Sequence, residues 1–236
     1  MLPSSNALLA DLPKQEYTQL TTHMKLVSLH KGQTLFEADE VPEFVYYPVG
    51  AIVSMLRDLD GGQVVESHIM GATCMVGIGT LGQPSFYRAT VRTAGLAYKL
   101  RASDLVRARE HCPVYVKRSL QSMNGVMGQM SAGLGCSIRH PVSKQLIRWL
   151  LRTYDRLLEP SIPMTHQEIA ELLGFQRVTI TKTLSGLSEC GAIATRRGEI
   201  VLLDRQKLEE QVCECYQVDI RHRQIFRWYG DGRQSA

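Results

Sequence analysis

The most constraining feature of this 236-residue chain is a pair of short amphipathic segments separated by one glycine, within residues 164–191. Thr165 can cap the first segment, and Glu168, three residues later, completes a capping box. Gly174 allows the left-handed backbone with which many helices end. A second apolar-periodic segment follows over about residues 177–188. The pattern predicts two helices joined by a tight glycine turn.

The second helix is predicted to bury one face and to project polar and basic side chains from the other. Its apolar face comprises Val178 or Ile180, with Leu184 and Leu187. Its outward side chains include Arg177, Thr181 and Lys182. Beyond it, "AIATRRGEIVLL" predicts a two-stranded hairpin with Arg196, Arg197 and Gly198 at the tip, and Asp204 can cap a short helix over "DRQKLEEQVCECY".

A helix pair followed by a hairpin with a basic tip is the winged helix-turn-helix arrangement. The second helix is slim enough for the major groove of DNA, and arginines on the wing can neutralise phosphates. We therefore expect double-stranded DNA as a partner. The side chains expected at DNA are Thr165, Gln176, Arg177, Val178, Thr179, Thr181, Lys182, Arg196 and Arg197.

The first hundred residues have a different pattern, with short runs rich in Val, Ile and Tyr. These runs are "KLVSL", "FVYYPV", "AIVSML", "QVVESHIM", "RATVRT" and "LAYKL". Their length and close spacing predict a β-roll or sandwich. Asp60-Gly61 is the strongest hairpin signal, because glycine can adopt the positive φ that a tight turn requires. The fold class is therefore α+β.

After Pro113 the period changes to that of a long helix, over about residues 113–138. Its apolar residues recur at steps of four and three: Val116, Leu120, Met123, Met127, Met130 and Leu134. A seam of this kind predicts a homodimer interface, with packing inside one chain as the alternative. Pro141 disfavours helical geometry at His140. We expect a hinge there, between a sensor domain over residues 1–140 and a DNA-binding domain over residues 141–236.

Composition excludes several classes of protein. Residues 1–140 hold 13 Lys and Arg against 11 Asp and Glu, and residues 141–236 hold 14 against 12, so bulk charge is uninformative about nucleic acid. The lack of a signal-peptide pattern and of a long apolar run predicts a cytoplasmic protein with no membrane partner. No hydrolase, metalloprotease or phosphate-loop motif is present, so we do not expect an enzyme.

The six cysteines lack any C-x-x-C pair, so their spacing predicts neither a disulfide framework nor a zinc site. Cys213 and Cys215, if helical, would point away from each other. Buried, unreactive thiols are the simplest interpretation.

The stretch "THQEIAELLGFQRVTITKTLSGLSECGAI" resembles the DNA-binding helices of the Crp/Fnr regulators. In addition, "KGQTLFEADEVPEFVYYPVGAIVSML" resembles the start of their cyclic-nucleotide-binding β-roll, and "RGEIVLLDRQKLEEQVCECY" the C-terminal end of a bacterial subgroup. The resemblance implies a bacterial transcription regulator that binds a near-palindromic operator as a homodimer, with RNA polymerase as a further partner. It places a base-reading arginine at Arg177 and a second basic position at Lys182, whereas Val178 replaces a glutamate of the catabolite-activator type.

The resemblance also places an effector pocket at Gly77, Arg88 and Ser131, but the carboxylate and the hydroxyl that hold a cyclic nucleotide in the family are missing. We therefore do not expect cyclic AMP to bind in the usual way. Haem ligation by Cys74, Met75 or His68, and a thiol switch at Cys112 or Cys136, remain alternative sensing chemistries. A protein-interaction module without DNA binding is a further alternative. The identity of any effector stays open.

Overall fold

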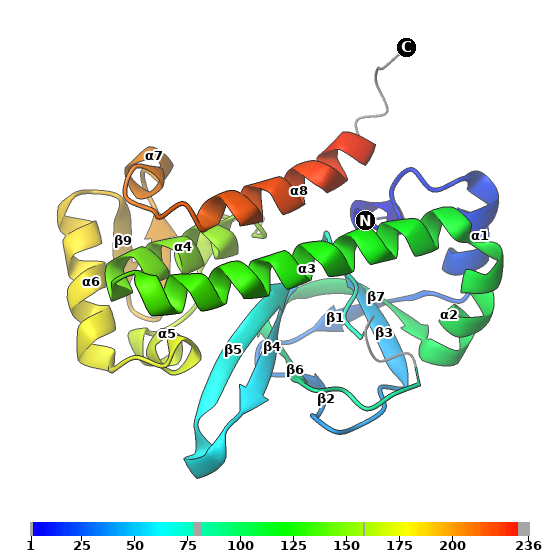
Figure 1. Ribbon diagram of the computed structural model, residues 1–236, viewed down its shortest axis with the longest axis horizontal. Helices are drawn as coiled ribbons and strands as arrows, with labels where there is room; N and C mark the ends of the chain where they lie inside the picture. The colour runs from blue at the N-terminus through cyan, green and yellow to red at the C-terminus, as the bar shows by residue number, and fades with distance from the viewer. Residues whose placement is uncertain (1, 78–81, 158, 231–236) are drawn as a thin grey trace.

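The computed structural model describes residues 2–77, 82–157 and 159–230. A β-roll occupies the N-terminal part, one long helix crosses the molecule, and a smaller helical domain with a β-hairpin lies at the far end of that helix (Figure 1). The combination of antiparallel sheets, a long helix and a C-terminal helix-turn-helix confirms the expected α+β class.

Two antiparallel sheets form the roll, with strand orders β1-β7-β3 and β2-β6-β4-β5. The strands are β1 (Lys25–Leu29), β2 (Thr34–Phe36), β3 (Phe44–Pro48), β4 (Ile52–Asp58), β5 (Val64–Met70), β6 (Arg88–Thr93) and β7 (Gly95–Arg101). The surrounding helices are η1 (Pro3–Ser5), α1 (Lys14–Thr21), α2 (Ala102–Ala108) and η3 (Arg109–His111). All six β-like runs of the sequence are strands, because each alternates or concentrates apolar residues that the roll buries.

The hairpin expected at Asp60-Gly61 joins β4 to β5 through a 3₁₀ turn, η2 (Asp60–Gly62). Both glycines adopt positive φ, 79° at Gly61 and 78° at Gly62. The amide of Leu59 donates to the carbonyl of Gln63 at 2.8 Å, so the loop is longer than the two-residue turn that the dipeptide alone suggests.

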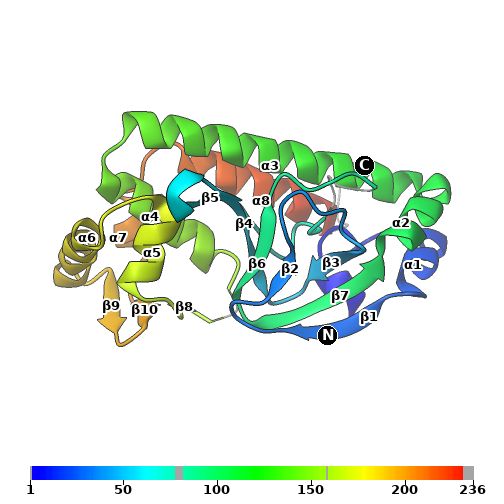
Figure 2. The same ribbon diagram turned by 90° about the horizontal axis from the view of Figure 1, so that it is seen from below.

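The expected long helix is α3 (Pro113–Arg139). Pro113 occupies its first turn, where a missing amide hydrogen costs nothing. His140, with φ −114° and ψ 146°, ends it in extended geometry before Pro141. One side of α3 covers the roll, as seen from below in Figure 2.

The C-terminal domain contains α4 (Val142–Tyr154), β8 (Ser161–Ile162), α5 (His166–Leu173), α6 (Arg177–Glu189), β9 (Ile193–Arg196), β10 (Glu199–Leu202), α7 (Arg205–Glu209) and α8 (Tyr216–Gly230). The predicted hairpin β9–β10 gains a third strand, β8, which pairs with β10. As expected, the side chain of Asp204 caps α7 by accepting from the amide of Lys207. However, α7 ends at Glu209, so Cys213 and Cys215 lie in the loop before α8, and the expectation that they diverge along a helix is wrong.

Sequence reasoning missed α8, which returns along α3 in both views of the ribbon (Figures 1 and 2). The two helices approach closely at Gly125, where an added Cβ would stand 1.7 Å from Cδ2 of His222. The imidazole Nδ1 of His222 also lies 2.8 Å from Nε2 of Gln129 on α3. The glycine-rich face of α3 therefore accommodates a helix of its own chain.

A buried polar cluster joins the roll to the C-terminal domain. Glu66 on β5 accepts from Arg92 at 2.7 Å and from the indole of Trp149 at 3.0 Å. Arg92 also donates to Thr153 at 2.6 Å, and its guanidinium lies 4.7 Å from the Trp149 ring. Burial lowers the pKa of Arg92, and the charge of Glu66 opposes that effect. Nearby, Asp219 on α8 pairs with arginines of α4.

Within the described ranges, no helix has the length and apolar character needed to cross a lipid bilayer.

Candidate nucleic-acid interface and cavity

The start and end of α5 are fixed by the groups that the sequence indicates. The hydroxyl of Thr165 accepts from the amide of Glu168 at 3.2 Å, and the carboxylate of Glu168 accepts from the amide of Thr165 at 2.7 Å. Gly174 ends the helix with φ 70° and ψ 30°, in the left-handed region. The chain then turns within two residues into α6, whose N-cap residue Gln176 makes no side-chain capping bond.

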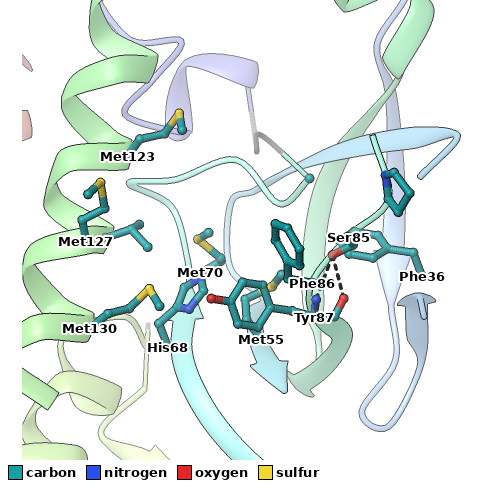
Figure 3. A pocket seen from close by; sticks show the side chains of 13 residues that line it. Phe36, Met55, His68, Met70, Ser85, Phe86, Tyr87, Met123, Met127 and Met130 are labelled. Atoms are coloured by element: carbon teal, nitrogen blue, oxygen red, sulfur yellow. Dashed lines mark hydrogen bonds between the residues drawn. The ribbon is translucent and has the colours of Figure 1, made fainter. Parts of the chain in front are cut away.

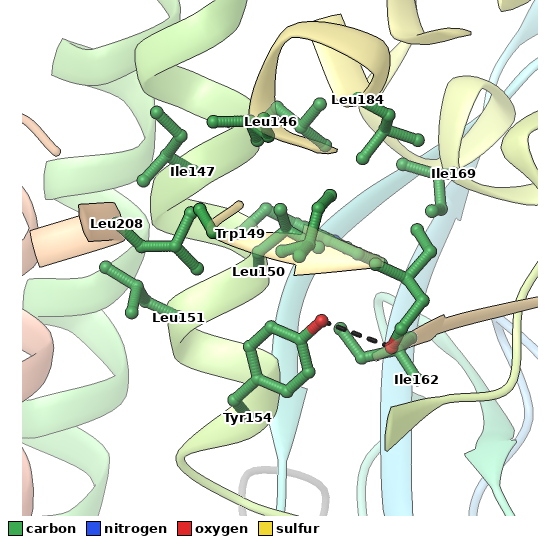
Figure 4. Close-up of a cluster of buried hydrophobic side chains, with 14 of the residues drawn as sticks. Leu146, Ile147, Trp149, Leu150, Leu151, Tyr154, Ile162, Ile169, Leu184 and Leu208 are labelled. Carbon is green, nitrogen blue, oxygen red and sulfur yellow. Dashed lines mark hydrogen bonds between the residues drawn. The ribbon is translucent and has the colours of Figure 1, made fainter. Parts of the chain in front are cut away.

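A shared core holds α6 in place. Ile169 on α5 and Ile180 and Leu184 on α6 are fully buried together with Leu146 and Leu150 of α4 (Figure 4). Of the two residues proposed for the apolar face, Ile180 is therefore the buried one. Val178, on the opposite side, is 76% exposed, and that exposure leaves it available for contact with another molecule.

The outer face of α6 is basic and polar. Gln176, Arg177 and Lys182 are exposed, while Thr179 and Thr181 are half-buried. The Thr181 hydroxyl lies 3.0 Å from Nδ1 of His166 at the start of α5. Desolvation by burial, and then the nearby charge of Arg177, lower the pKa of His166. A neutral imidazole there leaves the positive charge of this face on Arg177 and Lys182.

The wing extends the basic face. Arg196 and Arg197 are exposed at the end of β9 and in the turn that follows, where Gly198 adopts a φ of 74°. Among the described residues, neither wing arginine, nor Arg177, nor Lys182 takes part in an ion pair with an acidic side chain. Four uncompensated cations on two adjacent elements form a surface suited to a polyanion.

A contact from the roll reaches the supporting helix. The ammonium of Lys31, between β1 and β2, lies 2.7 Å from the carboxylate of Glu168 and donates to the carbonyl of Pro163 at 2.7 Å. Partial burial raises the pKa of Glu168, but hydrogen bonds from Lys31 and Thr165 outweigh burial and lower it overall. No sequence signal marks Lys31, because the residues it joins are more than 130 positions apart.

A second site is a cavity of about 160 Å³ between the roll and α3 (Figure 3). Three methionines of α3, Met123, Met127 and Met130, face side chains of the roll across it. The remaining lining residues are Phe36, Met55, His68, Met70, Gly77, Pro84, Ser85, Phe86, Tyr87 and Val126. The lining is therefore predominantly apolar.

Two polar side chains of the cavity, Ser85 and His68, already have partners. The Ser85 hydroxyl donates to the carbonyl of Tyr87 at 2.7 Å and accepts from its amide at 3.1 Å. His68 packs edge-on against the Tyr87 ring, with 5.3 Å between the ring centroids, and its Nδ1 lies 3.0 Å from the hydroxyl of Ser67. Burial, followed by the charge of Arg152, lowers the pKa of His68 to about 4. The cavity therefore presents a neutral imidazole at neutral pH.

The relationship to known proteins follows from sequence and structure together. Residues 144–211 match the family model of the Crp-like helix-turn-helix domain. The chain is 24% identical to the global nitrogen regulator of Synechococcus elongatus, over 89% of this chain and 99% of that protein. It is 22% identical to the nitrogen fixation regulation protein FixK of Bradyrhizobium diazoefficiens, over 87% and 89%. The chain therefore contains a Crp-like helix-turn-helix domain over residues 144–211 and is similar to two bacterial regulators along most of its length.

Solved structures of Crp/Fnr regulators have the same fold. FixK2 from Bradyrhizobium japonicum superposes with a TM-score of 0.70 at 20% identity, over 80% of this chain and 98% of that one. A CRP-family regulator from Thermus thermophilus, TTHB099, gives 0.64 at 20% identity, over 78% and 95%. These likenesses show that the chain shares the fold of Crp/Fnr regulators, and the match over residues 144–211 shows a helix-turn-helix domain of the Crp type.

The effector residues expected from the Crp/Fnr resemblance are not brought together. Gly77 lines the cavity, with a φ of 91°. Arg88 instead forms an ion pair with Asp58 at 2.6 Å, and Ser131 is exposed on α3; neither is a lining residue. Ile78 and Gly79, which follow Gly77 in the sequence, lie outside the described residues.

The haem candidates are also separated. His68 lines the cavity, whereas Cys74 and Met75 are buried in two hydrophobic clusters of the roll. Three methionines of the cavity, Met123, Met127 and Met130, are among the residues assigned to the helical seam. Their four-and-three spacing could not reveal that this part of the seam faces the roll. The spacing of apolar residues identifies one face of a helix, but it does not show what packs against that face.

Proposed function

We propose that the protein is a homodimer that reads a near-palindromic operator with two copies of α6. The observation that carries this proposal is the first turn of α6, where Arg177 and Val178 are exposed while buried Ile180 fixes the helix beneath them. In such a dimer the two helices would enter the major groove about 34 Å apart, one helical turn of DNA. Contact with RNA polymerase belongs to the same proposal.

An apolar row on α3 supports the dimer. Leu120, Met127 and Leu134 recur at seven-residue spacing and are 61%, 67% and 64% exposed, while Val116, Met123 and Met130 beside them are half-buried. Large apolar side chains in a continuous row are costly to leave in water. A second copy of the same helix offers a complementary surface, as in a coiled coil.

The roles at DNA differ from residue to residue. Arg177 would donate two hydrogen bonds to the O6 and N7 atoms of a guanine, and Val178 would contact a thymine methyl group. Lys182, Arg196 and Arg197 would neutralise phosphates, which fixes register without reading sequence. The polar side chains of Thr165, Gln176, Thr179 and Thr181 border the same face, with Thr165 and Thr181 already engaged by Glu168 and His166.

We further propose that the roll responds to a small, largely apolar effector. Sites for drug-sized ligands usually measure about 300–1,000 Å³, so a cavity of about 160 Å³ suits a smaller molecule. A cyclic nucleotide would place a phosphate and a ribose against methionine and phenylalanine side chains, where their lost hydrogen bonds to water would not be replaced. This supports the prediction that cyclic AMP does not bind in the usual way.

Selection of bound sequences from a random DNA pool tests the proposal. The wild type should enrich a two-fold-symmetric site, and Arg177→Ala should lose about 1–3 kcal/mol per half-site and relax selection at one base pair. Arg197→Ala should weaken binding to all sequences alike and reduce the salt dependence by about one phosphate contact. Arg109→Ala, an exposed arginine on η3, is the matched control and should change neither. An Arg177→Ala profile identical to the wild type would refute the assigned role.

A further inference from the structure

Four potential metal ligands meet at the hinge between α3 and the C-terminal domain. Cys136 lies in the last turn of α3 and His140 directly follows that helix, whereas Cys213 and Cys215 lie between α7 and α8. The three sulfur atoms and one imidazole nitrogen all lie within 4.8 Å of one another. They converge because α7 ends early and the loop turns both of its thiols towards the end of α3.

The distances within this cluster match a tetrahedral site. Sγ of Cys136 lies 3.6 Å from Sγ of Cys213, and Sγ of Cys215 lies 3.7 Å from Nδ1 of His140. For a zinc ion with Zn–S bonds of about 2.3 Å and a Zn–N bond of about 2.0–2.1 Å, tetrahedral angles place the ligand atoms about 3.6–3.8 Å apart. The two separations therefore correspond to edges of such a tetrahedron.

The surroundings of His140 provide independent support. Its Nε2, the nitrogen that faces away from Cys215, lies 3.3 Å from the carboxylate of Glu214. A histidine that binds zinc through one nitrogen commonly donates from the other to a carboxylate, which fixes the tautomer and the ring orientation. In addition, Gln145 donates to the carbonyl of His140 at 2.8 Å and holds the backbone of the hinge in place.

The burial of the cluster matches a structural site rather than a catalytic one. Cys136 and Cys213 are 2% and 6% exposed, and the imidazole of His140 is 19% exposed. Four protein ligands leave no open coordination position for water or substrate. A Cys136–Cys213 disulfide would use only two of the four groups and would not explain why His140 and Cys215 lie beside them.

We propose that Cys136, His140, Cys213 and Cys215 bind one zinc ion. Each thiol would release its proton to solvent as it coordinates the metal. The ion would fasten the end of α3 to the loop between α7 and α8, so that the long helix and the DNA-binding domain are joined at the hinge. This inference does not depend on the dimer, the operator or the effector.

Metal analysis of the full-length protein tests the site. Protein purified under reducing conditions without chelators, and reconstituted with Zn²⁺, should hold about one ion per chain. Replacement by Co²⁺ should give the intense visible absorption of tetrahedral cobalt and the near-ultraviolet band of thiolate-to-cobalt charge transfer. Cys213→Ser and Cys215→Ser should lose most of the metal and both bands, whereas Cys190→Ser, at an exposed cysteine outside the cluster, should keep them.

A milder variant keeps the test valid if the serine variants fold poorly. Glu214→Gln leaves all four ligands in place and should weaken zinc binding by about 10- to 100-fold in a chelator competition. The proposal is overturned if the reduced wild type binds neither Zn²⁺ nor Co²⁺, or if the Cys213→Ser and wild-type cobalt spectra agree. It is also overturned if Cys136 and Cys213 form a disulfide in the purified protein and reduction restores no metal binding. None of these measurements involves DNA.

Discussion

Val178 is the residue at which the proposed recognition surface differs from the catabolite-activator pattern. It is 76% exposed in the first turn of α6, next to Arg177. An exposed valine has no hydrogen-bonding group, so it can favour thymine through a methyl contact but cannot accept from the amino group of cytosine. Base preference beside the Arg177 contact should therefore depend on this side chain.

We predict that Val178→Glu changes which base is preferred without abolishing binding. A carboxylate at this position can accept from the N4 amino group of cytosine, and a good contact of this kind discriminates by about 1–3 kcal/mol. Sequencing of DNA selected by each variant measures the change. Val41→Glu adds the same charge at an exposed valine of the roll and should leave the preference unaltered. If both variants shift the selected bases alike, the effect is one of net charge.

For single residues, the sequence predicted local backbone geometry well, but it did not predict which distant side chains come together in space. The capping box at Thr165 and the left-handed Gly174 depend on neighbours within a few positions, so spacing alone revealed them. Cys136 and Cys213 are 77 residues apart, and their proximity depends on where α7 stops. Spacing could not provide that information, because the directions of the Cys213 and Cys215 thiols depend on whether these residues lie in a helix or in a loop.

At the scale of elements, α3 has two different apolar faces. The period of its apolar residues predicted the helix, but it did not separate the half-buried Met123 and Met130, which line the cavity, from the exposed Leu120 and Leu134. Met127 lies at the border, because it lines the cavity and is 67% exposed. No pattern in the sequence indicated that α8 would pack at Gly125 and Gly128 of α3, because that contact requires knowledge of two distant segments at once. Two predictions follow for α3: one concerns dimer formation through its exposed apolar row, and the other concerns the packing of α8 at Gly125.

Leu120→Glu should convert the proposed dimer to a monomer. The substitution would place a carboxylate from each chain in an apolar seam, where neither has a partner, and burial of an unpaired charge is strongly unfavourable. Multi-angle light scattering should then report the 26.5 kDa mass of one chain. Leu26→Glu, at a leucine of β1 that is 47% exposed, is the matched control. A dimer that persists in Leu120→Glu would locate the interface elsewhere.

Gly125→Ala should loosen α8 from α3. The new methyl group would stand 1.7 Å from Cδ2 of His222, so one helix must move, at a cost of about 1–3 kcal/mol. Chemical denaturation measures the change in the free energy of unfolding. Gly186→Ala, in α6, meets nothing within 4 Å and should stabilise by about 0.5–1 kcal/mol because alanine favours helix. Equal effects of the two substitutions would mean that α8 does not pack at Gly125.

At the scale of the whole molecule, the roll and the C-terminal domain meet through charged groups rather than through one continuous apolar core. The hydrophobic clusters of the roll and of the C-terminal domain comprise separate sets of residues. At their junction Glu66 and Arg92 of the roll meet Trp149, a member of the C-terminal cluster, and the Lys31 to Glu168 contact lies nearer the surface. Hydrogen bonds and ion pairs are directional, so they weaken sharply when their geometry changes. A junction made of such contacts therefore favours a few distinct arrangements, whereas a purely apolar junction would allow gradual displacement.

Two ion pairs with the same separation allow a direct test of this junction. Arg92–Glu66 and Arg101–Glu43 both have 2.7 Å between nitrogen and oxygen, but the side chains of the first pair are 2% and 3% exposed and those of the second 60% and 65%. Glu66→Gln should lower the free energy of unfolding by about 3–5 kcal/mol, because it leaves Arg92 buried without an opposing charge. Glu43→Gln should cost about 0–1 kcal/mol, since water and salt screen an exposed pair. Urea denaturation followed by tryptophan fluorescence measures both, and similar small losses would show that the buried pair does not hold the two parts together.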